Sequence, residues 1–368
     1  MQKVKLGDMC ESIFAGGDVP VNRWAKQKNN LYNIPIYTNG EKNNGLYGYT
    51  TEAKINKPCV TISARGTIGY SVIRKEPFYP AIRLITVIPK SDCLDLGYLC
   101  NYLNLYPFSK SGTSIPQLTV PDVKNLVLYL PDLNQQKSIS KRIDKINQII
   151  SYRKCQLEKL DELIKSQFIE MFGDININPY RLHFDLLGKV CDVRDGTHDS
   201  PAYYSTGFPL VTSKNVINGK IDISNCSLIC EEDFNKINIR SKVDKGDIIM
   251  PMIGTVGNPA IVDIEPNFAI KNVALIKFNN STVLNSFIMA LLCSDYFDKN
   301  VMMKVRGGTQ KFISLGDIRN LKIYIPPIEL QNKFDDFVER VDLVKTEIKQ
   351  SLAQLVILKK SLMQKYFG

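Results

Sequence analysis

The sequence contains one segment twice, at a spacing too long for a solenoid. DVKNLVLYLP at residues 122–131 returns as DIRNLKIYIP at residues 317–326, an offset of 317 − 122, or 195 residues. The same offset separates the Phe-Gly pairs at 172–173 and 367–368. Because solenoid repeats recur at roughly 20–50 residues, this spacing predicts a duplicated domain. A duplicated domain favours a target with two similar halves.

Shorter motifs upstream follow the same order with looser spacing. Each has one copy in either half: Leu6-Gly7 and Leu187-Gly188, Gly66–Gly69 (GTIG) and Gly254–Gly257 (GTVG), and Ser111–Thr113 and Gly307–Thr309. The repeated glycine motifs predict tight turns. The duplication therefore extends over most of the chain.

A length of 368 residues fits about two domains of ~150 residues each. Short apolar runs between turn residues predict strands at 60–63, 82–88 and 126–130, and again at 247–251, 273–278 and 321–325, with helices at 96–106 and 286–300. We expect an α+β fold of tandem strand-rich domains, each followed by a long helix. The expected boundaries are 1–133 (first domain), 134–173 (first helix), 174–328 (linker and second domain) and 329–368 (second helix).

The two long helices carry apolar residues at steps of three, four and seven, which is typical of a coiled-coil seam. A helix of 40 residues is roughly 60 Å long, more than its own domain needs for support. We expect the two helices to pair antiparallel with each other, the alternative being that each packs on its own domain. The seam residues are Ile139, Ile146, Leu160, Phe334, Val341, Ile348, Leu355 and Leu362.

Composition sets weaker limits. The net charge of +10 fits a polyanionic partner, but a generally lysine-rich composition explains it equally well. Nine cysteines without a signal peptide or a long apolar run indicate reduced thiols and a cytoplasmic protein without a membrane segment.

The chemistry of an enzyme is missing from the sequence. His183 and His198 are the two histidines, too few for a histidine-based catalytic or metal cluster. Cys226 and Cys230 have loose zinc-like spacing, but no second pair follows them. There is no phosphate-binding loop with a lysine, and Asn178-Pro-Tyr180 lacks the second proline of an amino-methyltransferase motif. We therefore expect no catalytic site, no metal and no bound cofactor.

The segments that lead into the long helices resemble a known junction. PDLNQQKSI at 131–139 and PPIELQNKF at 326–334 are similar to the P-P-L-x-E-Q-x-x-I junction of the specificity (S) subunits of type I restriction–modification systems. Gln135 and Leu330 stand where that family usually has Glu, and Asp132 replaces the second proline, whereas Gln136 and Gln331 keep their place. The phrases at 195–201 and 208–216 resemble the start of the family's recognition domains, and the resemblance extends over essentially all 368 residues.

This resemblance implies a mechanism. Two target recognition domains would each read one half of a bipartite site in double-stranded DNA, and the helix pair would set the distance between the halves. The helices would also dock two adenine methyltransferase (M) subunits, which bring S-adenosylmethionine and flip out an adenine in each half-site. An ATP-dependent motor/nuclease (R) subunit, using Mg²⁺, would join that core. This chain itself would supply specificity without catalysis.

Base reading requires bidentate side chains, with Lys, Ser and Thr around them for phosphates. Loops beside the repeated turns are the expected positions, although a repeated Gly-Thr can also simply cap a strand. Asp195 and Asp199 are expected to orient neighbouring side chains. The candidate DNA contacts are Asn39, Arg65, Thr67, Lys110, Ser111, Thr113, Ser114 and Gln117 in the first domain, and Thr197, His198, Ser213, Lys214, Asn215, Thr255, Arg306, Thr309, Gln310 and Lys311 in the second.

Two other classes of function stay open at this point. One is a protein-interaction scaffold that uses the helix pair without reading DNA. The other is a single-chain nuclease with dispersed catalytic residues, which the missing motifs disfavour. Neighbouring genes for an adenine methyltransferase and an ATP-dependent nuclease would separate these readings.

Overall fold

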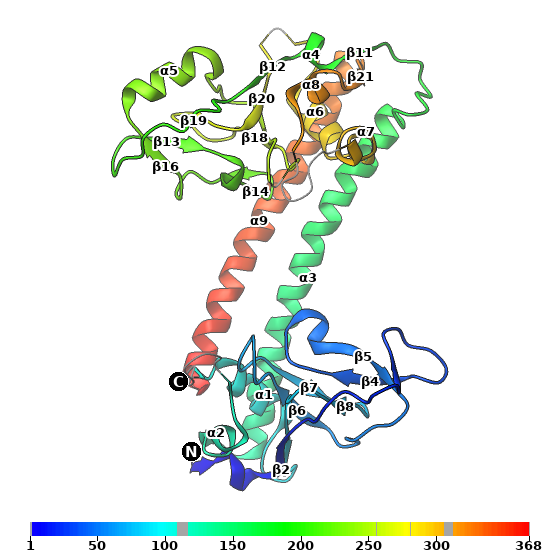
Figure 1. The fold of residues 1–368 in the computed structure, drawn as a ribbon, viewed down its shortest axis with the longest axis vertical. Helices are drawn as coiled ribbons and strands as arrows, with labels where there is room; N and C mark the ends of the chain where they lie inside the picture. The colour runs from blue at the N-terminus through cyan, green and yellow to red at the C-terminus, as the bar shows by residue number, and fades with distance from the viewer. Residues whose placement is uncertain (1, 109–116, 255, 280, 305–311, 368) are drawn as a thin grey trace. The chain divides into compact units, whose positions relative to one another are not determined.

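The structure is a computed structural model that describes residues 2–108, 117–254, 256–279, 281–304 and 312–367. The chain forms two compact units (Figure 1). Unit 1 comprises Met1–Lys154 and Gln350–Gly368, and unit 2 comprises Cys155–Lys349. Two uninterrupted helices, α3 (Leu133–Phe172) and α9 (Ile328–Phe367), contribute residues to both units.

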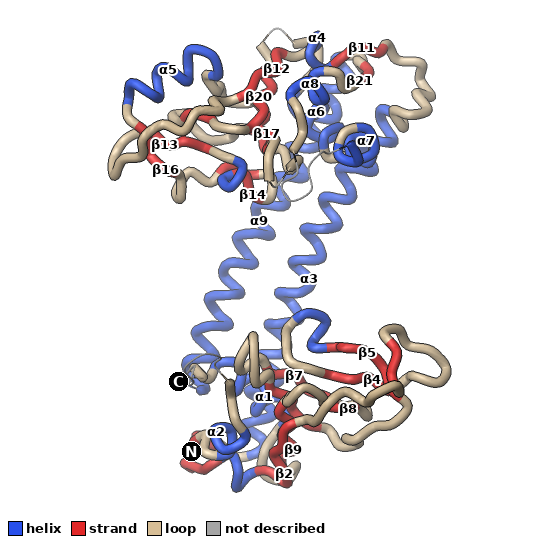
Figure 2. Tube along the Cα trace, in the orientation of Figure 1, coloured by secondary structure: helices blue, strands red, loops and turns tan. Residues whose placement is uncertain are grey.

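Unit 1 contains two four-stranded sheets and a two-stranded ribbon (Figure 2). The first sheet has the order β2-β9-β6-β7: Cys10–Ala15, Ile85–Pro89, Cys59–Ile62 and Ser71–Arg74. The second has the order β3-β5-β4-β8: Trp24–Ala25, Leu46–Thr50, Ile34–Tyr37 and Tyr79–Pro80. The ribbon pairs β1 (Gln2–Lys5) with β10 (Val127–Leu130), and the helices are α1 (Leu96–Leu105) and α2 (Val120–Lys124).

The described residues of unit 2 repeat the pair of sheets, with three strands in the second sheet, one additional ribbon and three more short α-helices than unit 1. Its main sheet has the order β12-β20-β17-β18: Asp192–Asp195, Val273–Lys277, Ile248–Pro251 and Ala260–Ile261. The second sheet has the order β16-β13-β19: Ser227–Ile229, Phe208–Val211 and Ala269–Ile270. Two ribbons pair β11 (Phe184–Leu186) with β21 (Lys322–Tyr324) and β14 (Val216–Ile217) with β15 (Lys220–Ile221). The helices are α4 (Leu187–Val190), α5 (Glu231–Ser241), α6 (Asn285–Leu292), α7 (Asp295–Asn300) and α8 (Leu315–Arg319).

One sequence prediction is wrong in this unit. Residues 286–300 form two helices rather than one, because α6 ends at Leu292 and α7 begins after Ser294. Cys293 lies between them with non-helical backbone angles. The Ser294 side chain does not cap α7; its hydroxyl donates to the Leu291 carbonyl at 2.6 Å and so satisfies an acceptor at the end of α6.

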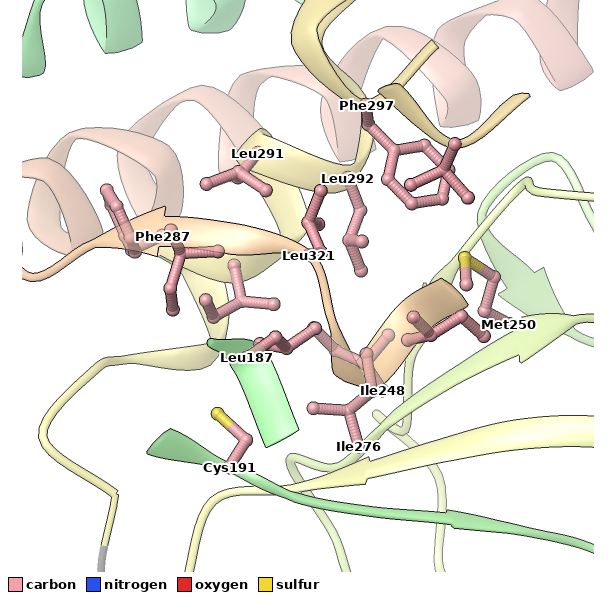
Figure 3. Packing of buried hydrophobic residues seen from close by; sticks show 14 of the residues in the cluster. Leu187, Cys191, Ile248, Met250, Ile276, Phe287, Leu291, Leu292, Phe297 and Leu321 are labelled. Atoms are coloured by element: carbon pink, nitrogen blue, oxygen red, sulfur yellow. The ribbon is translucent and has the colours of Figure 1, made fainter. Parts of the chain in front are cut away.

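The core of unit 2 lies where helix α6 covers the main sheet. Figure 3 shows Phe287 and Leu291 of α6 among Leu321 and the strand residues Ile248 and Ile276, all members of one buried apolar cluster. The strands β17 and β20 are buried along their whole length, which explains their continuous apolar runs. This rigid sheet is the frame from which the loops of the unit extend.

A buried glutamine begins each long helix. Gln136 is 1% exposed and Gln331 is 0% exposed. The Gln136 side chain donates to the carbonyls of Cys93 and Pro131 and accepts from the Asp95 amide. The Gln331 side chain repeats this pattern: it donates to the carbonyls of Thr282 and Pro326 and accepts from the Leu284 amide. The motif keeps glutamine because only an amide can satisfy two carbonyls and one N–H at a buried site.

In each unit the two long helices contact each other in opposite directions. In unit 1 the start of α3 meets the end of α9, where Ile139 and Ile143 share a buried cluster with Met363, and Arg142 Nη1 donates to Tyr366 Oη at 3.0 Å. In unit 2 the end of α3 meets the start of α9, where the Phe168 and Phe334 rings pack edge to face. The antiparallel pairing expected from the seam is thus confirmed, and each helix also packs on a strand-rich domain.

The seam residues differ in burial along the helices. Ile139, Ile146, Phe334, Val341 and Ile348 are buried. Leu160, Leu355 and Leu362 are half-buried. An ion pair between Lys345 Nζ and Asp161 Oδ1, 2.8 Å apart, links the two helices within unit 2.

Candidate nucleic-acid interface

In the described residues of each unit, one pair of strands runs parallel, and the carboxyl ends of the two strands meet at one edge of the second sheet. In unit 1 the pair is β4 and β8, and in unit 2 it is β13 and β19. Loops that leave such an edge are held by the rigid sheet while their side chains stay free to vary. We call residues 17, 38–40 and 81–82 the unit 1 edge, and residues 197–200, 212–215 and 271–272 the unit 2 edge.

A glycine brings a third segment against each edge. A Cβ on Gly16 would lie 2.5 Å from the Pro80 carbonyl oxygen, and one on Gly196 would lie 2.4 Å from that of Ile270. Both positions therefore accept only glycine. The residues that follow, Gly17 and Thr197, form isolated parallel bridges with Ala81 and Lys271, respectively. The two edges are structurally equivalent through this contact.

Three of the candidate residues of the first domain come together at the unit 1 edge. The Asn39 side chain accepts from the Ala64 amide at 2.7 Å and donates to the Ile82 carbonyl at 2.6 Å, so it ties three loops together. Next to Ala64, Arg65 donates through Nε and Nη2 to Gln117 Oε1 at 3.0 and 2.7 Å. This pair holds the guanidinium in one orientation and leaves Nη1 for another acceptor.

The repeated glycine motifs form tight turns in both units. Gly66 and Gly69 have φ of +70° and +88°, and Gly254 and Gly257 have φ of +79° and +83°. The amides of Gly69 and Gly257 donate to Ser63 and Pro251, closing equivalent turns. Thr67 is exposed in the first turn, beside a hollow of about 370 Å³ that Tyr70 and Asn104 also line.

At the unit 2 edge, the loop after β13 carries three candidate residues. The Asn215 side chain is buried and accepts from the backbone N–H and the hydroxyl of Thr212. It therefore shapes the loop and does not face outward. Lys214 is exposed and Ser213 is half-buried on the same turn.

Thr197 and His198 lie on the neighbouring loop, in a network centred on a buried carboxylate. Asp195 Oδ2 lies 2.9 Å from His198 Nε2, and Oδ1 is paired with the Arg240 guanidinium. The other ring nitrogen of His198 lies 2.9 Å from Asn272 Oδ1. Asp195 thus orients neighbouring side chains, as its position in the sequence motif led us to expect.

The electrostatics of this network favour a charged histidine. Hydrogen bonds to the Asn272 oxygen and to the Asp195 carboxylate raise the pKa of His198 above its ordinary value, although burial and Arg240 oppose the shift. A ring protonated on both nitrogens donates to both oxygens. Beside it lies a hollow of about 360 Å³ lined by Ser200, Lys236 and Arg240 among others.

Sequence reasoning missed several polar residues of this site: Lys236, Arg240, Lys271 and Asn272. Lys271 and Asn272 directly follow the strand β19, so their position after a short apolar run was a usable signal. Lys236 and Arg240 lie on α5 (Glu231–Ser241), a helix that has no counterpart in the described part of unit 1. A comparison of the two halves could not have found them.

Half of the candidate DNA contacts lie outside the described residues. These are Lys110, Ser111, Thr113, Ser114, Thr255, Arg306, Thr309, Gln310 and Lys311. The structure places Thr119 and Ser314 close after two of these segments, where each begins a short helix through a capping box with Asp122 or Asp317.

Within the described part of the chain, no three His, Cys, Asp or Glu side chains gather as a metal site would require. The loosely spaced cysteines have separate partners, since Cys226 Sγ contacts the Asp222 carbonyl and Cys230 Sγ contacts the Asp233 carboxylate. In the same ranges no helix is both long and apolar enough to cross a membrane.

Comparisons with known proteins point to one family. The model of the type I restriction modification DNA specificity domain matches twice, at residues 1–162 and 187–356. The type I restriction enzyme MjaIX specificity subunit of Methanocaldococcus jannaschii is 25% identical over 94% of this chain and 84% of its own length. A putative type I specificity subunit of Mycoplasma pneumoniae is 33% identical over 163 residues, 44% of either chain.

Among solved structures, the S subunit of a type I restriction–modification system from M. genitalium superposes with a TM-score of 0.60 at 17% identity, covering 100% of this chain and 96% of that chain. A second chain, from a description of complex assembly in the type I R-M system, gives 0.58 at 16% identity. The fold is therefore shared over the full length. The sequence matches to the first two Mycoplasma pneumoniae relatives span less than half of those proteins, at 44% and 41%.

Proposed function

The chain belongs to the family of type I restriction modification DNA specificity domains, and we propose that it is the non-catalytic DNA-recognition subunit of such a system. In this proposal residues 1–133 and 174–328 are target recognition domains, and residues 134–173 and 329–368 are spacer helices. Each domain reads one half of a bipartite site in double-stranded DNA. The observation that carries the proposal is the duplicated strand edge with its polar loops, one in each unit.

The proposed chemistry at the unit 1 edge follows from its hydrogen bonds. Gln117 holds the Arg65 guanidinium through Nε and Nη2, so the remaining donors of Arg65 point in a fixed direction. A guanidinium that is fixed in this way suits the O6 and N7 acceptors of guanine in the major groove. Asn39 fixes the loop that carries Arg65, because its side-chain amide accepts from the Ala64 N–H and donates to the Ile82 carbonyl.

The unit 2 edge differs in its donor set. Asp195 orients Arg240 and His198, and the loop residues Lys214 and Ser213 lie nearby in the chain fold. Base edges and phosphates both accept hydrogen bonds from such side chains. We assign Thr197, His198, Ser213 and Lys214 to contacts with the second half-site, and Asn215 to support of the loop. The nine candidate residues outside the described ranges are proposed to contact the same two half-sites.

The long helices have a second proposed role, as the docking surface for two adenine methyltransferase (M) subunits. Leu343 and Ile357 on α9 are 68% and 69% exposed, although coiled-coil helices usually expose polar residues. Exposed apolar side chains on a helix fit a protein partner. The M subunits would supply S-adenosylmethionine and the catalytic site, and an R subunit would supply ATP-driven translocation and cleavage with Mg²⁺.

A test compares adenine methylation across the host genome with and without this gene. We expect a bipartite methylated motif that disappears on deletion and returns with the gene. Arg65→Ala should change the bases of one half of the motif and leave the other half intact. If deletion leaves the methylation pattern unchanged, the DNA-recognition proposal is wrong, and a scaffold without base reading becomes the better description.

A second test addresses catalysis directly. The purified chain, mixed with S-adenosylmethionine and a duplex carrying the motif, should transfer no methyl group until the M subunit is added. Methylation by the purified chain alone would show that it is itself an enzyme.

A further inference from the structure

Lys271 is a buried cation with one neutral partner. The residue is 9% exposed and follows Ile270 of the apolar core. Its ammonium donates to Ser200 Oγ at 2.6 Å, and no carboxylate of the described residues forms an ion pair with it. Removing an ammonium group from water costs free energy unless an opposite charge or several acceptors replace the water.

The fold does not require a lysine here. Ala81 occupies the equivalent position in unit 1, where its amide donates to the Tyr37 carbonyl at 2.9 Å, as the Lys271 amide donates to the Val211 carbonyl at 2.9 Å. Both residues form the parallel bridge to the third segment, and the residues that follow, Ile82 and Asn272, have φ of +51° and +56°. The same bridge is thus built with and without the charge, although the turn that follows it is one residue longer in unit 1, so we infer that the ammonium group serves something other than folding.

Two hydroxyl side chains beside Lys271, those of Thr197 and Ser200, can donate hydrogen bonds, and the hollow that they line also has the carboxylates of Asp199 and Asp233 in its wall. Thr197 lies directly opposite it in the bridge, and the Thr197 hydroxyl oxygen accepts from the Asp199 amide at 3.2 Å, which leaves its O–H to donate. Ser200 is exposed at the mouth of the site. The nearby Asp195 carboxylate is already paired with Arg240 and His198. An ammonium beside two hydroxyls is the donor set that proteins use for phosphate oxygens.

We propose that Lys271, Thr197 and Ser200 bind one backbone phosphate of the DNA held by unit 2. Unit 1 lacks this contact because Ala81 stands in place of the lysine. The inference rests on the proposed function, since it names the group that the unit 2 edge binds. The contact anchors the second domain on its half-site without reading a base, because a phosphate carries no sequence information.

Ser200→Asp is the sharpest test, because it supplies the opposite charge from within the protein. The new carboxylate pairs with Lys271, so we expect the midpoint of thermal unfolding to rise while affinity for DNA falls. The probe is a labelled duplex carrying the methylated motif of the host, bound by the full chain in complex with its M subunit. Ser200→Asn removes the same hydroxyl without adding a charge, so it is the matched comparison and should weaken binding less than Ser200→Asp does. Unchanged affinity in Ser200→Asp overturns the proposal.

Lys271→Met tests the same contact from the other side. The binding constant for DNA falls with salt by about 0.9 in log K per phosphate contact and tenfold change in salt. Loss of one contact should therefore reduce that slope by about 0.9 and weaken binding about eightfold at 0.1 M salt. The loss should be equal for the motif duplex and for a duplex with scrambled half-sites. An unchanged salt slope in a folded Lys271→Met protein contradicts the proposal.

The outcomes separate this inference from the proposed function. If the unaltered complex shows no salt-dependent binding to either duplex, the proposed function itself fails. If the unaltered complex binds and both variants bind equally well, only the phosphate contact fails. Inorganic phosphate provides the last arm: a large rise in the unfolding midpoint at constant ionic strength, with unaltered DNA affinity in Lys271→Met, would assign the site to a free anion and overturn the DNA contact.

Discussion

The unit 1 edge and the unit 2 edge share a parallel bridge between equivalent segments, but they carry different side chains. In unit 1 the edge is built from Gly17, Ala81 and Ile82, whereas in unit 2 the equivalent bridge and turn use Thr197, Lys271 and Asn272. The residue before the invariant glycine is Ala15 in one unit and Asp195 in the other. The glycines and the bridge are common to both units, whereas the side chains at the edge differ and the turn after the bridge is one residue longer in unit 1. Divergence at the loops on a kept frame is what two different half-sites would require.

The two units also differ at equivalent buried positions of their main sheets. In unit 2 the side chain of Lys277 is buried between the Asp247 and Asp244 carboxylates, at 2.7 Å from each. In unit 1 the equivalent strand positions hold Ile88 and Cys59, which belong to an apolar cluster. Burial raises the pKa of Asp247 although Lys277 opposes the shift, while the hydrogen bond from Lys277 lowers the pKa of the more exposed Asp244. An ion pair and an apolar pair thus occupy one place in the duplicated sheet.

Exchanging these pairs gives the largest expected effect. Lys277→Ile alone leaves Asp247 charged and unpaired in the core, so we expect unit 2 to lose about 3–5 kcal/mol of unfolding free energy. The double variant Lys277→Ile with Asp247→Cys, which copies unit 1, should recover most of that loss, because buried ion pairs are often replaceable by apolar pairs. Chemical denaturation of the full chain measures both. A double variant as unstable as the single one would show that the two sheets are not interchangeable.

The buried glutamines should respond alike, because here the two units agree. Gln136→Leu and Gln331→Leu each leave two carbonyls and one amide without their side-chain partner. We expect a loss of about 3 kcal/mol in either case, since unsatisfied buried groups are costly. The exposed neighbours serve as controls, with Gln135→Leu and Asn332→Leu within about 0.5 kcal/mol of the unaltered chain. A large loss in only one unit would break the equivalence of the two junctions.

The glycines at the edges should show a smaller, equal effect. Gly16→Ala and Gly196→Ala each force a Cβ against a backbone carbonyl, so the third segment must move away. We expect about 2 kcal/mol of destabilisation in each unit, in the range of other overpacking changes. Gly17→Ala is the matched control, because a Cβ there meets nothing within 4 Å. If Gly16→Ala and Gly17→Ala are equally stable, the close approach of a Cβ at residue 16 to the Pro80 carbonyl does not matter for stability.

The smallest expected effect is a pH dependence confined to unit 2. Because the folded pKa of His198 is raised, the protonated ring stabilises the fold, fully at pH below the unfolded value of about 6.5. That contribution is lost as pH rises through the folded pKa. The effect is small, since the His198 side chain is 61% exposed. NMR titration of the ring protons should give a lower pKa in Asp195→Asn, and a pKa that does not move would exclude the carboxylate as a cause.

The features that both units share could be predicted because the motif for each occurs in both halves of the sequence. The helix seam, the tight glycine turns and the glutamine junction have copies in both halves, so one copy supported the other. Features present once gave no such support: α5 with Arg240, and the lysine at position 271, stand out only when the fold aligns them with an unrelated segment or with Ala81. The break between α6 and α7 was missed because apolar residues continue across it, and the hydrogen bond from Ser294 to the Leu291 carbonyl that ends α6 cannot be read from the sequence.

Because the end of α9 packs on unit 1, the first domain cannot bury all of its apolar surface until the whole chain has been synthesised. Tyr366 and Phe367 cover the cluster around Tyr98 and Tyr102, and the contact of Arg142 with Tyr366 closes over 224 residues. At about 5–20 residues per second, translation needs roughly 10–45 s to make that intervening stretch. During this time the first domain exposes an apolar face that only later synthesis can cover. A chain that ends before residue 363 would keep this apolar face open, and transiently exposed apolar surface of this kind makes a chain prone to aggregation.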